Sequence, residues 1–352
     1  MNRPIISFCI PTYNRASCVV QCVKWILEYP SNDIEIIVSD NASSDNTQDS
    51  LSQITDARMK YFRNDRNEGV AYNIDRALHE AAGEFCFLIS DEDEVNAEKI
   101  LKLIEIIKRN SELAIIYGSV QSADISGNTW DGPGVCRLTA GEQAIKQMSF
   151  KHPYLSGIIV NKNLYGRVKT QKDWYEKDLF YPHEYLCFLL ASLGDILVIE
   201  DTIVFTHDYD NITYSGNRGI SNAYSFEGRL QTCKDRTRII NDNIDNKILK
   251  EKLMLDNFRH MMTAATAGEH MLFTNENKNI FGFNSKKRNL QIAVSEFVDE
   301  FNKFTSYNKI SLSKNFQYNI KKQCSILRLK IIGINFYGSS IYKIAKVIFD
   351  KL

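Results

Sequence analysis

The chain has 352 residues, of which 44% are hydrophobic and 24% are charged. Lysine plus arginine and aspartate plus glutamate number 43 each, so no overall charge draws the protein to nucleic acid or to anionic lipid. The length exceeds that of an average domain, and we therefore expect a core domain with an appendage.

Eight cysteines are scattered along the chain without a Cys-x-x-Cys pair, which predicts unpaired thiols in a reducing cytoplasm. The first apolar run, 5–10, has the pattern of a strand and not of a signal peptide. The longest apolar stretch, 186–199, is shorter than the roughly 20 residues that cross a bilayer. We expect a cytoplasmic protein, either soluble or peripheral at the inner face of the membrane.

Short apolar runs alternate with helical patterns through the first third of the chain. Strands are expected at 5–10, 34–39, 59–62 and 85–89, and helices at 16–29, 70–81 and 97–108. Because parallel strands need crossover helices, this alternation predicts an α/β fold with a mostly parallel, doubly wound sheet. Further strands are expected at 114–120, 154–160, 196–199 and 202–205.

The strand at 85–89 leads into four consecutive acidic residues, 91–94. The carboxyl ends of parallel strands share one edge, so this group is expected to meet the polar clusters 11–15 and 40–45 in one crevice. Crowded carboxylates repel one another by roughly a kcal/mol or more per close pair, a cost that a divalent cation would remove. The alternative is a solvated acidic turn.

No glycine-rich phosphate-binding loop is present, because neither Walker spacing nor Gly-x-Gly-x-x-Gly follows the first strand. A phosphate-containing ligand would then need a cation as its counter-charge. Asp91 and Asp93 offer hard oxygen ligands, which select Mg²⁺ or Mn²⁺ over zinc.

The character of the chain changes near residue 223. Segments 121–136 and 211–222 are rich in loop-forming residues, and helical stretches with polar breaks follow. We therefore expect a catalytic domain over 1–222 and a helical region over 223–352. The last stretch, 341–352, is a basic amphipathic pattern suited to a membrane surface; the alternative is a helix packed on its own domain or in a homo-oligomer.

Four polar motifs follow the predicted strands in a fixed order and spacing. They are Ile-Pro-Thr-Tyr-Asn-Arg at 10–15, Val-Ser-Asp-Asn-Ala-Ser-Ser-Asp at 38–45, Asn-Glu-Gly-Val at 67–70 with Asn73, and Phe-Leu-x-x-Asp-x-Asp at 87–93. In these motifs the chain, over about residues 4–210, resembles family 2 glycosyltransferases of the GT-A fold. The resemblance implies transfer of a sugar from a nucleoside diphosphate donor.

Roles at the donor site follow from the resemblance. Three residues after the first strand are implied to frame the base and ribose: Pro11, Thr12 and Tyr13. Asp40 is implied to accept a hydrogen bond from a pyrimidine N–H, and Asn67 and Arg76 to reach base, sugar or diphosphate. The alternatives are a helix N-cap for Asn67 and a solvated helix position for Arg76.

The acidic motif departs from the commonest family form, Leu-Asp-x-Asp-Asp, because Ile89 stands at the first acid. Either the metal-binding acids are shifted to Asp91 and Asp93, or Asp91 alone aligns with the second acid. We expect Asp93 to ligate Mn²⁺ or Mg²⁺ directly and Asp91 to contact the ribose or a ligand of the cation. A late histidine completes the set in some GT-A enzymes, which indicates His207 or Asp208 here.

Inversion at an anomeric carbon requires the acceptor hydroxyl to lose its proton as it attacks, so a carboxylate must face the reaction centre. In the family this acid begins a late helix, which matches the stretch 182–194. The resemblance implies Glu184 as the catalytic base, with His183 in place of the acid that usually precedes it. Asp178 is the second candidate for the base. The alternative is a first-turn glutamate favoured by the helix dipole.

Two further groups are candidates for ligand contact. Arg218, on the glycine-bearing loop 211–222, is implied to close over the phosphates. Trp174, Tyr175 and Tyr181 are candidates for stacking on sugar rings, although aromatic side chains more often pack in a core.

Together these residues imply an inverting, metal-dependent hexosyl- or N-acetylhexosaminyltransferase with a UDP-sugar as the first candidate donor. The acceptor would be a hydroxyl of a bacterial surface glycan, a polyol-phosphate or a polyprenyl-linked sugar, and nucleic acid is not an expected partner. Two other classes remain. A sugar-nucleotide nucleotidylyltransferase usually carries a basic, glycine-rich first loop, and a non-catalytic scaffold would use the helical tail as its working part.

Overall fold

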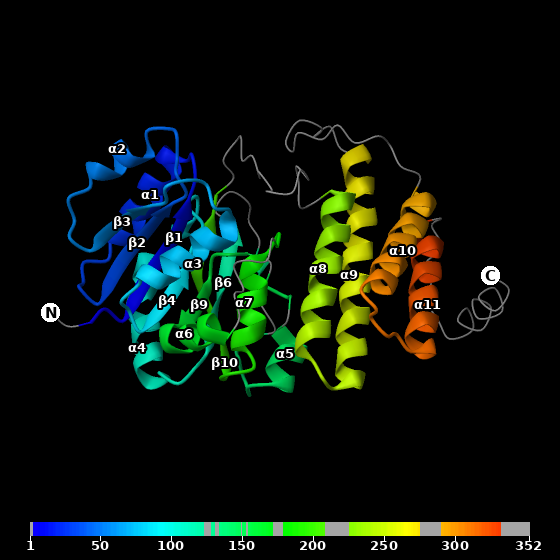
Figure 1. The fold of residues 1–352 in the computed structure, drawn as a ribbon. Helices are drawn as coiled ribbons and strands as arrows, with labels where there is room; N and C mark the ends of the chain where they lie inside the picture. Colours follow the sequence, from blue (N-terminus) through cyan, green and yellow to red (C-terminus); the bar gives the residue numbers. More distant parts are fainter. Residues whose placement is uncertain are drawn as a thin grey trace. The chain divides into compact units, whose positions relative to one another are not determined.

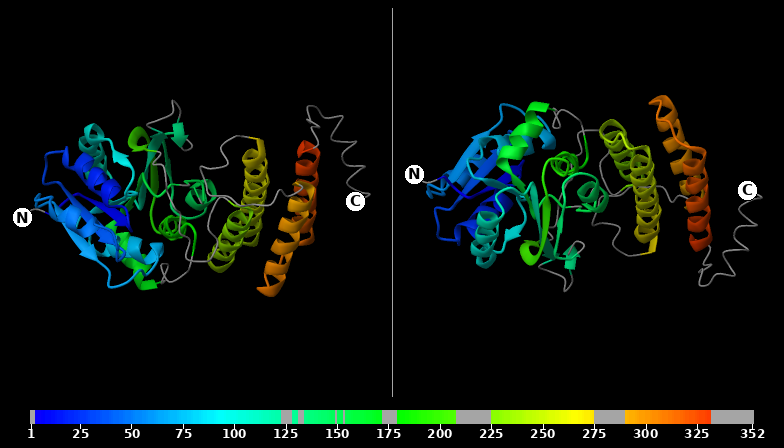
Figure 2. Two further views of the ribbon diagram at one scale, coloured as in Figure 1. Left: turned by 90° about the horizontal axis from the view of Figure 1, so that it is seen from above. Right: turned by 90° about the horizontal axis from the view of Figure 1, so that it is seen from below.

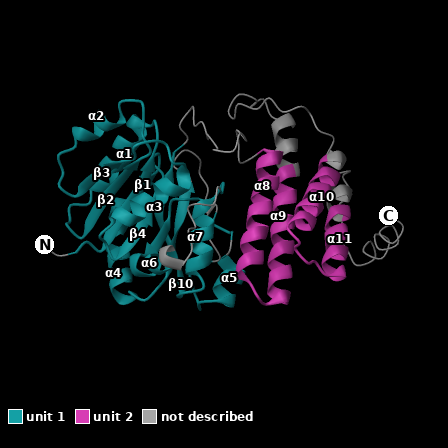
Figure 3. Cartoon of the chain, viewed as in Figure 1, with its two compact units in different colours: residues 1–210 teal, residues 211–352 magenta. Residues whose placement is uncertain are grey.

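The computed structural model describes residues 3–122, 128–130, 134–148, 150–152, 154–171, 179–207, 225–274 and 290–331. The chain divides into two compact units, residues 1–210 and 211–352 (Figure 3). The sequence places the boundary at residue 222 instead; both positions fall within 208–224, outside the described residues.

The first unit is built on a mixed, ten-stranded sheet (Figure 1). Its strands are β1 (Ile6–Thr12), β2 (Ile34–Asp40), β3 (Met59–Arg63), β4 (Phe85–Leu88), β5 (Glu94–Val95), β6 (Ile115–Ser122), β7 (Asn128–Trp130), β8 (Cys136–Leu138), β9 (Ile158–Asn161) and β10 (Ile196–Thr206). The main path runs β3-β2-β1-β4-β9-β6-β10-β5. The first four strands of this path are parallel, as the alternating pattern predicts.

Helices cover both faces of this sheet (Figure 2). They are α1 (Ala16–Leu27), α2 (Thr47–Ser52), α3 (Val70–Glu80), α4 (Ala97–Arg109), α5 (Glu142–Met148), α6 (Lys162–Gln171) and α7 (Pro182–Leu190). The apolar stripes of α1 and α4 share one core cluster with Phe8 and Ile10 of β1. Cys9 points to the opposite face, where its thiol donates to the carbonyl of Ala77 on α3. Burial on both faces explains why β1 is mostly apolar and does not alternate between apolar and exposed polar residues.

One antiparallel strand, β9, lies between β4 and β6. Ile158 is opposite Leu88 on one side and Tyr117 on the other. The apolar run at 154–160 therefore forms a short strand, preceded by a segment that turns toward the end of β4. The two runs at 196–199 and 202–205 belong to a single strand, β10, which contains bulges where it pairs with β6.

The described residues of the second unit form helices, and the polar breaks in the sequence separate them. They are α8 (Phe226–Asn243), α9 (Lys247–Thr274), α10 (Leu290–Tyr307) and α11 (Lys314–Ile331). Figure 2 shows α8 paired with α9 and α10 paired with α11. Phe258, Phe297 and Phe301 pack edge to face in their shared core. Among the described helices of the chain, none combines the length and the apolarity needed to cross a bilayer. The predicted amphipathic helix at 341–352 lies outside the described residues.

Candidate active site

The carboxyl ends of β1 and β2 lie side by side because the strands pair in register, with Thr12 opposite Asp40. Asn73, in the first turn of α3, links the two ends. Its amide nitrogen donates to the carbonyls of Thr12 (3.2 Å) and Ser39 (2.9 Å), and its oxygen accepts from the Ser39 hydroxyl (2.7 Å). The side chain is buried, so Asn73 fixes the two strand ends relative to each other.

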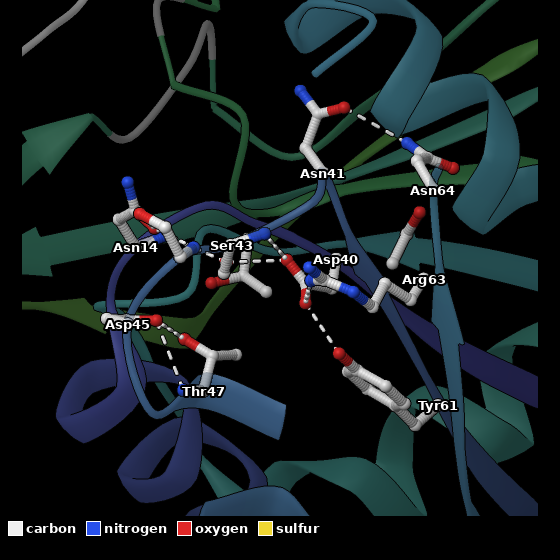
Figure 4. A network of polar contacts seen from close by, with 12 residues as sticks. Asn14, Asp40, Asn41, Ser43, Asp45, Thr47, Tyr61, Arg63 and Asn64 are labelled. Atoms are coloured by element: carbon white, nitrogen blue, oxygen red, sulfur yellow. Dashed lines mark hydrogen bonds and ion pairs between the residues drawn. The ribbon is translucent and has the colours of Figure 1, made fainter. Parts of the chain in front are cut away.

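Asp40 is fully buried and each of its carboxylate oxygens already accepts two hydrogen bonds (Figure 4). Oδ1 accepts from the backbone nitrogen (2.9 Å) and the hydroxyl (2.5 Å) of Ser43. Oδ2 accepts from the Tyr61 hydroxyl (2.5 Å) and from Arg63 (3.0 Å). Burial and the Asp40 charge raise the pKa of Tyr61. A nucleobase that donates a hydrogen bond to Asp40 must therefore displace one of these four donors. Without such a ligand, Asp40 links the loop after β2 to β3.

The loop after β1 is tied to the loop after β2 through Asn14 (Figure 4). The Asn14 backbone nitrogen donates to the Ser43 hydroxyl (2.8 Å), and its side-chain oxygen accepts from the Ser44 nitrogen (2.7 Å). Asn14 has a φ of 54°, a left-handed conformation that asparagine tolerates better than most residues. The neighbouring Tyr13 has 37% of its surface exposed. Its ring is thus a solvent-accessible surface on a fixed backbone.

The two candidates from the third motif have different surroundings. Asn67 is exposed and its side-chain oxygen accepts from the Asn41 amide (2.8 Å), which brings it to the polar loops. Arg76 pairs with Glu80 on its own helix (2.9 Å), and its guanidinium lies 5.8 Å from the centre of the Phe62 ring. The structure therefore gives Arg76 partners on α3 and β3.

Asp91, just beyond β4, is buried against the end of β1. Its Oδ2 accepts from the Thr12 hydroxyl (2.6 Å) and its Oδ1 from Arg15 (2.9 Å), which also contacts Glu92. Burial raises the pKa of Asp91, although Arg15 and Thr12 oppose the shift. The acidic group is therefore not a solvated turn: three of its four members, Asp91, Glu92 and Asp93, are buried.

Asp93 is held from the other side of β4. The Ser156 hydroxyl donates to its Oδ2 (2.5 Å) and accepts from the Ser90 backbone nitrogen (2.8 Å). Burial, with a contribution from the Asp91 charge, raises the pKa of Asp93 to about 7. Among the described residues, Asp93 has no basic partner within ion-pair distance.

His207 lies at the rim of this acidic group. Its Nε2 is 2.9 Å from Glu94 Oε2, and its ring stacks on Trp25 of α1 with the ring centres 4.9 Å apart. A proton on His207 lowers the pKa of the Asp93 carboxyl against the effect of burial. His207 therefore lies close to the acidic strand end.

The chemistry of these side chains fits a hard divalent cation. Two buried carboxylates, Asp91 and Asp93, repel one another, and a cation would relieve that repulsion. Arg15 already supplies positive charge to Asp91, which leaves Asp93 as the carboxylate in need of a counter-charge. In the part of the chain that the structure describes, no three His, Cys, Asp or Glu side chains are gathered as a ready-made metal cluster.

Glu184 lies in the first turn of α7, where Pro182 occupies the first helical position. Only 5% of Glu184 is exposed, and it lines a cavity together with Tyr117, His152, His183 and Cys187. Burial and, in smaller part, the Glu184 charge raise the pKa of Cys187 to about 12. The cavity thus brings an acid, two histidines and a phenol together.

His152 and Tyr117 are cavity residues that the sequence analysis does not single out. Burial lowers the pKa of His152 to about 4, so its ring is neutral at pH 7. The ring stacks on Tyr117 with centres 5.0 Å apart, and its Nδ1 is 2.8 Å from the Tyr154 carbonyl. Tyr117 is opposite Ile158 of β9, the strand that begins just after Ser156. The cavity and the acidic group thus adjoin the same short strand.

Several expected site residues cannot be compared with the structure. Trp174, Tyr175, Asp178, Asp208 and Arg218 lie outside the described residues. Tyr181 is described, and its ring meets the ring of His183 edge to face with centres 5.9 Å apart. Pro11 lies in β1 opposite Ser39.

Comparison with known families matches residues 7–162 to the model of glycosyl transferase family 2. These residues are therefore similar to a family 2 glycosyltransferase domain. The matched region contains the ends of β1, β2 and β4 and finishes just after β9. Asp40, Asp91 and Asp93 therefore lie inside the matched region, whereas Glu184 and His207 lie beyond it.

Curated relatives are similar over part of the chain. A Campylobacter jejuni protein named GalNAc(5)-diNAcBac-PP-undecaprenol beta-1,3-glucosyltransferase is 28% identical over 196 residues, which is 51% of this chain and 63% of the relative. The chain thus covers less than two thirds of that relative. An uncharacterized glycosyltransferase of Haemophilus influenzae is 28% identical over 226 residues, 63% of this chain and 83% of its own length.

Among solved structures, S. aureus TarS 1–349 in complex with UDP-GlcNAc has a similar fold. The TM-score is 0.63 at 14% sequence identity, and the match covers 95% of this chain and 93% of that one. The chain has the GT-A fold followed by C-terminal helices, as the sequence analysis predicts.

Proposed function

We propose that the protein is a glycosyltransferase that moves a sugar, with inversion at the anomeric carbon, from a nucleoside diphosphate donor to a hydroxyl acceptor. The observation that carries the proposal is the meeting of Thr12, Asp40 and Asp91 at one sheet edge within a family 2 domain. The acceptor class is a bacterial surface glycan or a lipid-linked sugar. It is supported by the name of the Campylobacter relative, which acts on an undecaprenol-linked glycan.

UDP-sugars are the donors to test first. A related Escherichia coli protein, 26% identical over 121 residues, is named for a UDP-Glc donor. We assign the base and ribose to the crevice between the loops after β1 and β2, where Tyr13 exposes its ring and Asn67 lies at the edge. Asp40 then either holds Ser43 and Arg63 in place, or accepts a hydrogen bond from the nucleobase after one of its present hydrogen-bond donors has moved away.

The diphosphate is assigned to the acidic group at the end of β4. Asp93, with Asp91 and His207 beside it, would hold Mg²⁺ or Mn²⁺, which as a Lewis acid would take up the negative charge of the departing diphosphate. Arg15 keeps Asp91 and Glu92 oriented and limits their mutual repulsion. Arg218 is proposed to approach the phosphates from the loop at 211–222.

Glu184 is the proposed catalytic base. As the acceptor hydroxyl attacks the anomeric carbon, its proton passes to the Glu184 carboxylate while the sugar–phosphate bond breaks. Phe150 and Phe188 form part of the lining of its cavity, next to polar side chains such as His152 and Tyr117. Its place in a buried cavity with His152 supports this role over that of a solvated helix-dipole residue.

The test replaces Glu184 by Gln, which keeps the shape of the side chain and removes the base. We expect transfer to fall by about a hundredfold or more, with donor affinity unchanged. Glu98, exposed in the first turn of α4, is the matched control. Glu98→Gln should keep full activity. A Glu184→Gln enzyme with near wild-type turnover would show that the base lies elsewhere.

The donor itself is best identified by thermal shift across nucleotide sugars, with and without Mn²⁺. The correct donor stabilises the folded protein by mass action, in proportion to ln(1 + [L]/Kd). Donor hydrolysis by the purified protein separates an enzyme from a non-catalytic scaffold. Stabilisation by nucleoside triphosphates with sugar phosphates alone would favour a nucleotidylyltransferase instead.

A further inference from the structure

Charge is divided unequally between the two units. Residues 1–210 contain 20 Lys and Arg against 31 Asp and Glu, whereas residues 211–352 contain 23 against 12. From residue 301 to the last residue, ten basic residues stand against one acid, Asp350. The neutral total therefore hides a strongly basic helical unit.

Exposed apolar side chains in the described part of this unit gather at two helix turns. Ile248, in the first turn of α9, is 83% exposed, and Tyr307, at the end of α10, is 88% exposed. Tyr318, one turn into α11, is 50% exposed. Figure 1 shows the α8–α9 turn and the α10–α11 turn at the same end of the helices. Exposed side chains of this size and clustering mark an interaction surface.

Direct hydrogen bonds hold the two turns together. Ser313, which precedes α11, donates its backbone nitrogen (3.0 Å) and its hydroxyl (2.7 Å) to the carboxylate of Glu251. Glu251 lies one helical turn beyond Ile248. The apolar residues of both turns therefore belong to the same end of the unit, and the Glu251 carboxylate, which keeps its negative charge, is engaged by Ser313.

Lysines lie near these apolar side chains in the sequence, and the α8–α9 turn also exposes two acids, Asp242 and Asp245. Lys247, Lys309 and Lys314 are exposed, and Lys321 continues the outward face of α11 beyond Tyr318. Within the described residues none of the four has an ion-pair partner. We call Lys247, Ile248, Tyr307, Lys309, Lys314 and Tyr318 the turn surface.

We propose that the turn surface docks the protein on an anionic lipid bilayer. Ile248 and Tyr307 would enter the interfacial layer, while Lys309 and Lys314 meet the phosphate headgroups. Tyrosine suits this position because its ring is apolar and its hydroxyl remains in the wet layer. Each lysine close to an anionic surface raises partition roughly fivefold.

The chemistry favours lipid over the other polyanions. Ile248 is an aliphatic side chain that cannot stack on a nucleobase, and nucleic-acid sites alternate cations with stacking aromatics along a groove. The apolar residues here project from helix ends instead. The proposal goes beyond the transfer reaction, and it does not depend on the donor or on Glu184.

The test uses the full chain and vesicles of phosphatidylcholine with or without phosphatidylglycerol, in co-sedimentation at low salt. Replacing Lys309 and Lys314 together by Gln should weaken partition to the anionic vesicles about 25-fold. Replacing Ile248 and Tyr307 together by Ser should weaken it about tenfold or more. All four side chains are exposed, so the far-UV circular dichroism and the melting temperature should match the wild type.

Matched controls come from the first unit. Lys108 and Lys146 are exposed lysines, and Leu101 is 55% exposed. The variants Lys108→Gln with Lys146→Gln, and Leu101→Ser, should bind vesicles like the wild type. Absence of binding to anionic vesicles, or equal losses in the controls, would overturn the proposal. So would turn-surface variants that only dissociate an oligomer or release nucleic acid. Donor hydrolysis by the same variants, measured without vesicles, should match the wild type, which keeps a failure of membrane binding separate from a failure of the transfer reaction.

Discussion

Asn73 is expected to contribute about 3 kcal/mol to the free energy of unfolding of the first unit, although it is not expected to contact the sugar donor. Its buried amide makes four hydrogen bonds, to the carbonyls of Thr12 and Ser39, from the Ser39 hydroxyl and from the Asn64 amide. A buried hydrogen bond contributes about 1 kcal/mol net, and the partners left behind are themselves buried. We therefore expect Asn73→Ala to lower the free energy of unfolding by about 3 kcal/mol.

Urea unfolding followed by tryptophan fluorescence measures this change. All three tryptophans lie within residues 1–210, so the signal reports the first unit alone. With a slope of about 2 kcal/mol per molar urea, the midpoint should fall by about 1.5 M. Asn73→Asp should be at least as damaging, because its carboxylate would face the Thr12 and Ser39 carbonyls.

Asn46 provides the control, since it is exposed and makes no side-chain capping hydrogen bond at the start of α2. Asn46→Ala should shift the midpoint by no more than about 0.3 M. If Asn73→Ala behaves like Asn46→Ala, the linkage between the ends of β1 and β2 does not stabilise the unit. A folded Asn73→Ala protein should also bind UDP more weakly, because Thr12 and the loop that follows it lose their anchor.

Two further predictions concern other parts of the first unit. Burial raises the pKa of Glu35, but hydrogen bonds led by Lys60 outweigh it and lower that pKa below 4.5. The contribution of the Glu35 carboxylate to the free energy of unfolding should therefore be complete above pH 4.5 and disappear as the pH falls through the lowered pKa. The urea midpoint of the wild type should then fall more steeply with decreasing pH than that of Glu35→Gln. Gly157 has a φ of 88°, and an added Cβ would lie 2.9 Å from a Val120 methyl carbon. Gly157→Ala should therefore lower the free energy of unfolding in urea by about 2 kcal/mol or more. Gly166→Ala is the control and should not lower it, because nothing lies within 4 Å of a Cβ at that position.

The sequence predicts the parallel half of the sheet well because its strands are buried on both faces. Residues 5–10 are apolar except for Ser7, a pattern without a helical period, and the residues after each such stretch fall at the same edge of the sheet. The resemblance of the motifs to a known family then predicts a donor site at that edge. The position of β9 between β4 and β6 is not predictable in this way, because an apolar run of four residues does not specify its partners.

Within the site, sequence identifies residue types but not their partners. Arg15 and Asn73 belong to motifs that are visible in the sequence, yet only the folded chain places Arg15 against Asp91 and Asn73 between two strand ends. Ser156 gives no signal beyond a serine before a glycine, and its contact with Asp93 spans 63 residues. The sequence analysis expects Asp40 to accept a hydrogen bond from the nucleobase. In the structure its Oδ2 already accepts from two side chains on β3, Tyr61 and Arg63, which no local sequence pattern connects to Asp40.

The central place of β9 also has a consequence for synthesis on the ribosome. β4 gains its partner β1 early, but its other edge stays open until Ile158 emerges, about 70 residues after Leu88. At ~10 residues per second, that edge of Phe-Cys-Phe-Leu is exposed for several seconds in every nascent chain. Fragments that stop before residue 161 would keep it open permanently and should aggregate, so a truncated expression clone must extend past β9.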